Sequence, residues 1–133
     1  MDFWENIGDM RTYIDEVDIE CIYECIRIIL FDGLFLSSDN IIRNILINEK
    51  YELLSIDEDD LFGKTKLVFG RSKWCKKHKF RNIINQILTE FETNSEIIKT
   101  NVKNIFDKYN FDKYDVFAYR MDNFREIINS ELI

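Results

Sequence analysis

The sequence predicts an all-α fold, a single-domain bundle of five or six helices spanning residues 1–133. Apolar side chains recur at helical spacing through most of the chain. The chain has no proline and only four glycines, fewer turn-forming residues than a turn-dense β-sandwich needs. With 46% hydrophobic residues in 133, the chain is large and apolar enough to bury a core of its own.

The first predicted helix, residues 17–31, should be the central helix of the bundle. Its polar side chains Glu20, Glu24 and Arg27 recur at helical spacing, so they form a narrow stripe on an otherwise apolar cylinder. A helix of this kind is surrounded by others on most sides. The side chains expected to be fully buried are Ile22, Ile26 and Ile29.

Turn signals separate this helix from the next. Gly33 is expected to end the first helix, because glycine takes the left-handed conformation common at helix C-termini. The polar residues 37–39 are candidate caps for a second helix, whose apolar face lies within residues 41–46 and which ends near Leu54. Residues 64–70 alternate only weakly, so they are predicted as an irregular loop, with one short strand as the alternative.

The C-terminal half has the clearest helical pattern. A third helix is predicted from Lys76 onward. Thr93 and Glu96 have the spacing of a capping box, which predicts that a new helix starts there. Asp112 is expected to cap the last helix. The apolar faces of the three helices comprise Phe80, Ile83, Ile84, Ile87, Leu88 and Phe91; then Ile98, Val102, Ile105, Phe106 and Tyr109; then Tyr114, Phe117, Met121, Phe124 and Ile128.

The net charge of -7 hides a strong asymmetry along the chain. Residues 1–62 contain 16 acidic and 4 basic side chains, whereas residues 64–81, the basic block, contain 8 basic side chains and no acidic one. Two interpretations are open: the acidic run Asp57–Asp60 pairs with the basic block, or the two are separate patches for separate partners. The overall excess of acid disfavours binding to phosphates, so nucleic acid is not the expected partner.

The sequence predicts a cytoplasmic protein that does not enter a membrane. Residues 1–16 lack the basic start and the apolar run of a signal peptide. Charged residues interrupt the most apolar stretch, residues 26–36, which is well short of the roughly 20 apolar residues that span a bilayer. The three cysteines should stay reduced in such a compartment.

All three cysteines and the single histidine fall into two pairs, Cys21 with Cys25 and Cys75 with His78. A zinc site with three cysteines and one histidine would need this set, but the first pair lacks the usual ligand spacing, and buried thiols are ordinary core residues. Lysines around Cys75 favour its thiolate form, yet no group that could complete a catalytic site is apparent. We therefore expect no metal, no cofactor and no enzyme activity.

The predicted function is that of an acidic protein-binding domain that occludes a basic partner, as an immunity protein or antitoxin neutralises a toxic nuclease. One alternative is a viral-type helix-bundle regulator, in which the apolar stripe from Tyr114 to Phe124 holds a partner helix in a groove. A further alternative is a zinc-stabilised or RNA-binding module that uses the basic block. The residues expected to contact the basic partner are Asp15, Glu16, Asp18, Asp57, Glu58, Asp59, Asp60 and Trp74.

Overall fold

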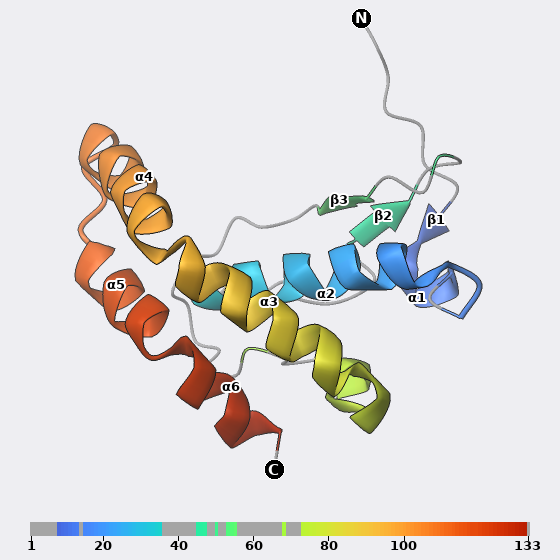
Figure 1. Ribbon diagram of the computed structural model, residues 1–133. Helices are drawn as coiled ribbons and strands as arrows, with labels where there is room; N and C mark the ends of the chain where they lie inside the picture. Colours follow the sequence, from blue (N-terminus) through green and yellow to red (C-terminus); the bar gives the residue numbers. More distant parts are fainter. Residues whose placement is uncertain are drawn as a thin grey trace, which may run out of the picture. The chain divides into compact units, whose positions relative to one another are not determined.

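The computed structural model describes residues 8–13, 15–35, 45–47, 50, 53–55, 68 and 73–132 (Figure 1). These residues form six α-helices and three short strands, which confirms the predicted all-α class and adds a small sheet that was not predicted. The chain divides into two compact units, Met1–Lys77 and His78–Ile133. That residues 1–133 fold as one domain stays a prediction.

The first unit is built around α2, Ile19–Leu34. The helix begins after Asp18, whose Oδ1 atom accepts a hydrogen bond from the Cys21 backbone N–H at 2.9 Å. The stripe of Glu20, Glu24 and Arg27 is exposed, as predicted. Ile26 and Ile29 are fully buried, but Ile22 is only half-buried, so its predicted burial was wrong. The buried residues of α2 are Cys21, Cys25, Ile26, Ile29, Leu30, Gly33 and Leu34.

Gly33 does not end α2, contrary to the prediction. The helix continues through Leu34 and is closed by Phe35, whose backbone N–H donates to the Asp32 carbonyl at 3.1 Å. A glycine is needed here for a different reason: an added Cβ atom would lie 2.3 Å from the Cγ1 atom of Val68. The small residue therefore permits a close approach to another part of the unit and does not permit an unusual backbone conformation.

The predicted helix over residues 41–54 was wrong where the structure describes it. Two strands lie there instead, β2 (Ile45–Ile47) and β3 (Leu53–Ser55), and β1 (Gly8–Asp9) completes an antiparallel sheet of order β1-β2-β3 (Figure 1). Leu46 pairs with Asp9 on one side and with Leu54 on the other. A short apolar run rich in isoleucine suits a strand as well as a helix, and the five residues between β2 and β3 are enough for a hairpin connection.

The first unit contains two further short helical elements. The helix α1, Met10–Tyr13, follows β1 directly, and the 3₁₀-helix η2, Lys73–Lys76, lies at the end of the first unit. Within the predicted loop at residues 64–70, the structure describes only Val68, which is buried in a bend. The choice between loop and strand therefore falls outside the described residues.

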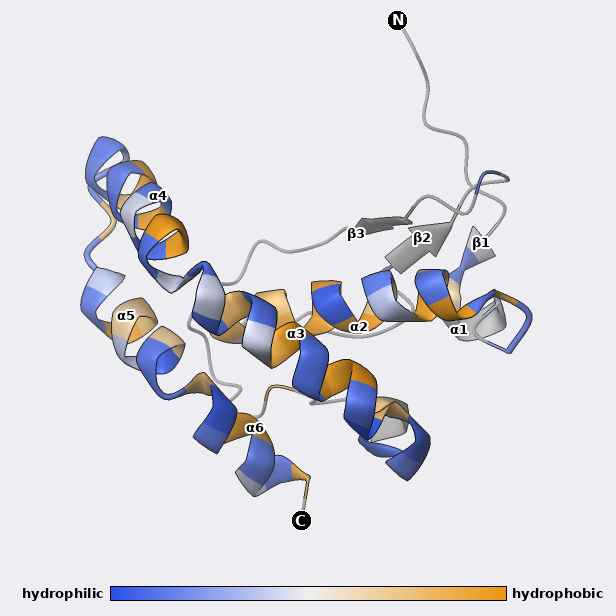
Figure 2. Cartoon of the chain, in the orientation of Figure 1, coloured by the Kyte–Doolittle hydropathy of each residue, from blue (hydrophilic) through white to orange (hydrophobic). Residues whose placement is uncertain are grey.

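The second unit contains the 3₁₀-helix η3 (His78–Phe80) and four helices: α3 (Arg81–Thr93), α4 (Ser95–Lys108), α5 (Tyr114–Asp122) and α6 (Phe124–Glu131). The predicted apolar face of α3 is buried throughout, and Figure 2 shows its separation from the polar face. The prediction for α4 was only partly correct, because Ile105 and Tyr109 are exposed. Its buried residues are Val102 and Phe106.

Two helices start within two residues of the predicted positions, but the caps predicted for them were wrong. Thr93 is the last residue of α3, and its hydroxyl donates to the Thr89 carbonyl at 2.9 Å and does not cap α4. This bond back to the preceding turn is the usual competitor of a cap for a threonine in a helix. Asp112 does not cap α5, which starts after Lys113. The predicted last helix is in fact two, separated at Asn123, whose side-chain amide donates to the Tyr119 carbonyl at 2.8 Å.

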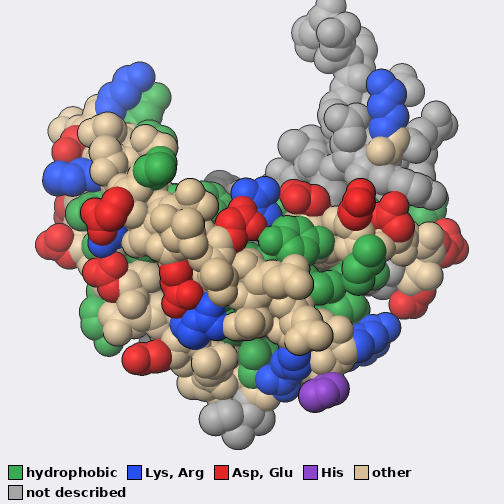
Figure 3. Space-filling model, in the orientation of Figure 1, with side chains coloured by type: hydrophobic (Ala, Val, Ile, Leu, Met, Phe, Trp, Pro, Cys, Tyr) green, Lys and Arg blue, Asp and Glu red, His purple; other side chains and the backbone are tan. Residues whose placement is uncertain are grey.

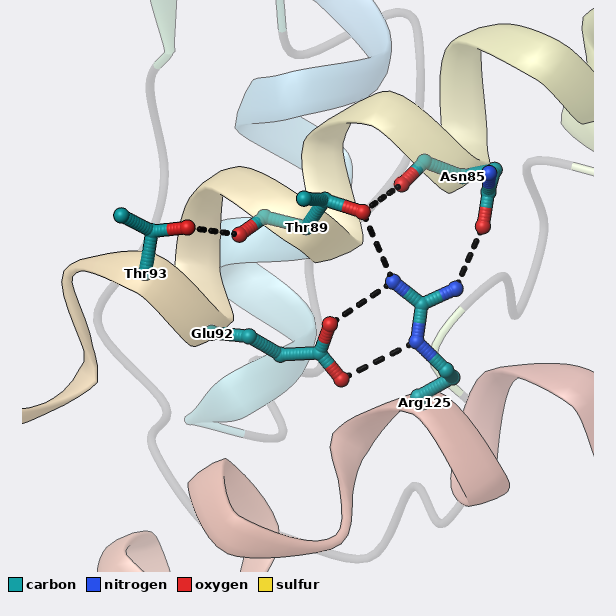
Figure 4. Close-up of polar contacts among 5 residues, drawn as sticks. All are labelled: Asn85, Thr89, Glu92, Thr93 and Arg125. Atoms are coloured by element: carbon teal, nitrogen blue, oxygen red, sulfur yellow. Dashed lines mark hydrogen bonds and ion pairs between the residues drawn. The ribbon is translucent and has the colours of Figure 1, made fainter.

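One arginine connects α6 to α3 (Figure 4). The Nε and Nη2 atoms of Arg125 donate to the two carboxylate oxygens of Glu92 at 3.0 and 2.8 Å. Its Nη2 atom also donates to the Thr89 hydroxyl at 3.0 Å, and its Nη1 atom donates to the Asn85 side-chain oxygen. The hydrogen bond to Arg125 lowers the pKa of Glu92. Paired bonds of this geometry are directional, so Arg125 adds a specific contact between α6 and α3 to their apolar packing.

Candidate functional site

An acidic surface lies at the start of α2, formed by Asp15, Glu16, Asp18, Ile19 and Glu20. We call this set the α2 acidic surface. The Glu16 backbone N–H donates to the Tyr13 carbonyl at 2.9 Å and closes the turn that leads into the helix. Carboxylates are favourable at this end of a helix because the helix dipole is positive there. All four carboxylates are exposed, and Figure 3 shows acidic side chains gathered over α2 and its start.

An apolar side chain projects from this acidic surface. Ile19, the first residue of α2, is 63% exposed although isoleucine is among the residues most often buried. Its neighbours in sequence, Asp18 and Glu20, are both exposed carboxylates. Ile97 and Ile105 of α4 are exposed to a similar degree, at 64% and 55%, so Ile19 is set apart by the four carboxylates around it and not by its exposure.

The sequence prediction missed Ile19 and also Phe31, which is 40% exposed on the same helix. Phe31 comes eleven residues after Glu20, close to three helical turns, so the spacing alone places it on the polar stripe. Its ring packs edge to face against Phe35 with a centroid distance of 5.3 Å. Ile19 gave no such signal, because it stands at the first position of a long apolar run.

The structure describes only part of the predicted partner-binding set. Asp15, Glu16 and Asp18 are described and exposed, and they lie together before and at the start of α2. The acidic run Asp57–Asp60 lies outside the described residues. Trp74 lies in η2, but its side chain is also outside what the structure describes. Their part in binding stays a prediction.

None of the three cysteines forms a disulfide, and all three are buried. Burial is the main cause that raises the pKa of Cys21, Cys25 and Cys75, and Cys75 is affected to a smaller degree by Cys25. The expectation that neighbouring lysines favour a Cys75 thiolate was wrong, because the thiol is fully buried while Lys77 and Lys79 are exposed. A buried thiol of this kind is a core residue and a poor nucleophile.

No group of three histidine, cysteine or acidic side chains that could hold a metal ion occurs among the residues that the structure describes. His78, the only histidine, is exposed in η3. The described thiols therefore carry no argument for a metal centre.

The apolar stripe proposed as a groove for a partner helix contributes to the core. Phe117, Met121 and Phe124 are buried, so they do not offer an open surface to a second protein. The ring of Phe117 lies 6.4 Å from that of Phe106 in α4, and Phe124 lies 6.2 Å from Phe91 in α3. This stripe holds the second unit together, as the seam between packed helices does.

Comparisons with known proteins give no relative: no family model, no curated protein and no solved structure matches the chain. In the described part of the chain, no helix is both long enough and apolar enough to cross a membrane.

Proposed function

We propose that this protein is a protein-binding domain that occludes a basic partner through the α2 acidic surface. The observation that supports this most directly is the 63% exposure of Ile19 between the exposed carboxylates of Asp18 and Glu20. Interface residues that contribute most to affinity lie at the centre of a contact and are shielded by polar neighbours. Ile19 would be buried by the partner, and the carboxylates around it would pair with lysine or arginine.

Charge supports a basic partner in particular. The chain has a net charge of -7, and its first 62 residues contain 16 of the 25 acidic side chains. A surface of one sign attracts a partner of the opposite sign from a distance and raises the rate of association. Such a protein would act by covering its partner, as the neutralisers of toxic nucleases do, and three reduced cysteines suit a cytoplasmic location.

The test is binding to purified basic nuclease toxin domains, measured by biolayer interferometry at low and at high salt. The variant Asp15→Lys/Glu16→Lys reverses two charges of the α2 acidic surface. Its control, Asp115→Lys/Glu126→Lys, makes the same change of charge at exposed positions in α5 and α6. We expect the first variant to slow association at low salt by about tenfold or more, and the control to have a much smaller effect.

A third variant tests the apolar centre. Ile19→Ala removes apolar area from an exposed position, so it should speed dissociation without lowering the free energy of unfolding by more than about 0.5 kcal/mol. Equal slowing by the two double variants would mean that net charge alone matters. An Ile19→Ala complex with the wild-type dissociation rate would remove Ile19 from the interface.

A further inference from the structure

A row of exposed side chains runs along one side of α4. Its four members, which we call the α4 ridge, are Ile97, Asn101, Ile105 and Tyr109. They are four residues apart, so each lies next to the following one on the helix surface. The Tyr109 backbone N–H donates to the Ile105 carbonyl at 3.2 Å, which extends the helical spacing to the end of the row. Ile97, Ile105 and Tyr109 are 64%, 55% and 69% exposed, so three large apolar side chains lie exposed on one line. Apolar residues that gather on a surface mark an interaction site, whereas single ones do not.

The neighbouring helix α5 packs against the other side of α4. Lys99 and Lys103 each stand two residues after a member of the ridge, about 200° round the helix. The Nζ atom of Lys99 lies 2.9 Å from the Oδ1 atom of Asp122, and the Nζ atom of Lys103 lies 5.1 Å from the centre of the Tyr114 ring. The side that faces α5 is therefore opposite the α4 ridge, and α5 does not cover it.

A second exposed row, which we call the α4 flank, lies beside the ridge. Each of its members immediately precedes a ridge residue, so the flank is about 100° away on the helix. It begins with an acid, ends with a base and has two uncharged residues between them: Glu96, Thr100, Asn104 and Lys108. Glu96 pairs with Lys99 at 3.2 Å, but Lys99 also has Asp122 as a partner. Glu96 can therefore turn to another cation without leaving Lys99 unpaired.

We propose that the α4 ridge is a dimer interface, on which the α4 ridge of a second copy of this chain lies antiparallel. A two-fold axis beside Asn101 places Ile97 of each copy opposite Ile105 of the other, because both stand four residues from Asn101. The two Asn101 side chains meet at the axis, where an amide can donate to its counterpart and accept from it. This interface is separate from the α2 acidic surface and does not depend on the function proposed for it.

Charge favours a second copy in this orientation. The two-fold axis brings the flanks of both copies together, with Glu96 of each beside Lys108 of the other. A parallel pair would bring acid level with acid and base level with base. Residues 78–133 contain 8 basic and 9 acidic side chains, a net charge of -1, whereas the whole chain carries -7. This part of the chain therefore repels its copy little. One helix face is small for an interface, so we expect a weak dimer.

Sedimentation equilibrium of the full chain over a concentration series tests the proposal. We expect a monomer–dimer equilibrium, and Ile97→Glu/Ile105→Glu should weaken dimerisation at least about tenfold, because it places like charges opposite each other at the centre of the contact. The matched control Val116→Glu/Tyr119→Glu adds the same charges at exposed apolar side chains of α5 and should have a much smaller effect. A wild-type chain that is monomeric at every concentration, or equal weakening by the two variants, would overturn the proposal.

A charge exchange tests the orientation. Glu96→Lys and Lys108→Glu should each weaken dimerisation by about threefold or more, because each places like charges together at two symmetry-related positions. The double variant Glu96→Lys/Lys108→Glu should restore the wild-type dimer. Single variants without effect, or a double variant that does not restore dimerisation, would overturn the antiparallel arrangement. Both positions are exposed, so the melting temperature of the variants should stay near that of wild type.

Discussion

Gly33 of α2 and Val68 approach each other so closely that a Cβ atom on Gly33 would lie 2.3 Å from the Cγ1 atom of Val68. Non-bonded carbon atoms do not approach this closely, so a larger residue at position 33 must displace Val68 or the helix. Val68 is itself fully buried and has little room to move. The contact thus connects the last turn of α2 to a residue 35 positions later in the chain.

Gly33→Ala should destabilise the protein, although the same substitution usually stabilises a helix interior by about 0.8–1 kcal/mol. Overpacking a filled core costs about 1–3 kcal/mol, which outweighs the gain in helix propensity. The free energy of unfolding, measured by urea denaturation, should fall accordingly. Val68→Ala provides the control, because it makes room for the new methyl group. The double variant should then lose less stability than the sum of the two single losses.

The pairing of Arg125 with Glu92 should make stability depend on pH. The pKa of Glu92 is lowered in the folded protein from its usual value of 4.5, so the pair contributes stability above that value. This contribution is lost as the pH falls through the folded-state pKa. Because the Glu92 side chain is about half exposed, we expect under about 1 kcal/mol at pH 7. The difference in unfolding free energy between wild type and Glu92→Gln should therefore shrink on acidification.

A matched control separates this pair from other carboxylates. Glu126→Gln changes an exposed glutamate on the same helix as Arg125. The difference in unfolding free energy between wild type and Glu126→Gln should stay small and nearly constant over the same pH range. If the difference in unfolding free energy between wild type and Glu92→Gln is the same at pH 7 and at pH 3, the pair has no stabilising role.

The thiols should resist alkylation in the folded protein. Cys25 and Cys75 are fully buried, and burial raises the pKa of both thiols, so neither solvent access nor thiolate is available. Intact mass spectrometry after a short treatment with iodoacetamide at pH 8 should find the native protein unmodified and the urea-unfolded protein with three adducts. Rapid labelling of Cys75 before unfolding would show that its burial is wrong.

The helices of the second unit could be predicted from the sequence because each must bury one face. The buried residues of α3 recur at the spacing that this requires; they are Ile83, Ile84, Ile87, Leu88 and Phe91. The strands β2 and β3 could not be predicted in the same way, because Ile45–Ile47 is too short to show any period. Their pairing also depends on partners elsewhere in the chain, such as Gly8–Asp9.

The misassigned ends and surfaces have related causes. Thr93 has the spacing of a cap, but its hydroxyl finds a partner one turn earlier, which spacing cannot reveal. Gly33 resembles a helix stop, but its role depends on Val68, a contact that no local pattern indicates. For the candidate site, the acidic residues were evident from composition, whereas the exposure of Ile19 depends on how α2 packs. Local patterns thus identified the helices and the acidic residues. Contacts between residues far apart in the sequence determined the role of Gly33 and the exposure of Ile19.

Two isoleucines of α2 provide a direct test of how this helix is buried. Ile26 is fully buried, so Ile26→Ala should lower the free energy of unfolding by about 2–5 kcal/mol through lost burial and the cavity left behind. Ile19→Ala makes the same chemical change at a side chain that is 63% exposed, so its effect should stay below about 0.5 kcal/mol. Urea denaturation of both variants checks this. A loss below about 1 kcal/mol for Ile26→Ala would mean that α2 is not central to the core.

The acidic run Asp57–Asp60 distinguishes pairing within the chain from binding to a partner. If the run contacts a basic protein, Asp59→Lys/Asp60→Lys should slow association much more at low salt than at high salt. Exposed charges are screened beyond a Debye length of about 8 Å at physiological ionic strength, which explains the dependence on salt. If the run pairs with the basic block, the same variant should lower the melting temperature and leave association insensitive to salt. Measuring both quantities on one variant decides between the two. A variant that keeps both the wild-type association rate at low salt and the wild-type melting temperature would exclude the run from either role, and the α2 acidic surface would then have to supply the charge that attracts the partner.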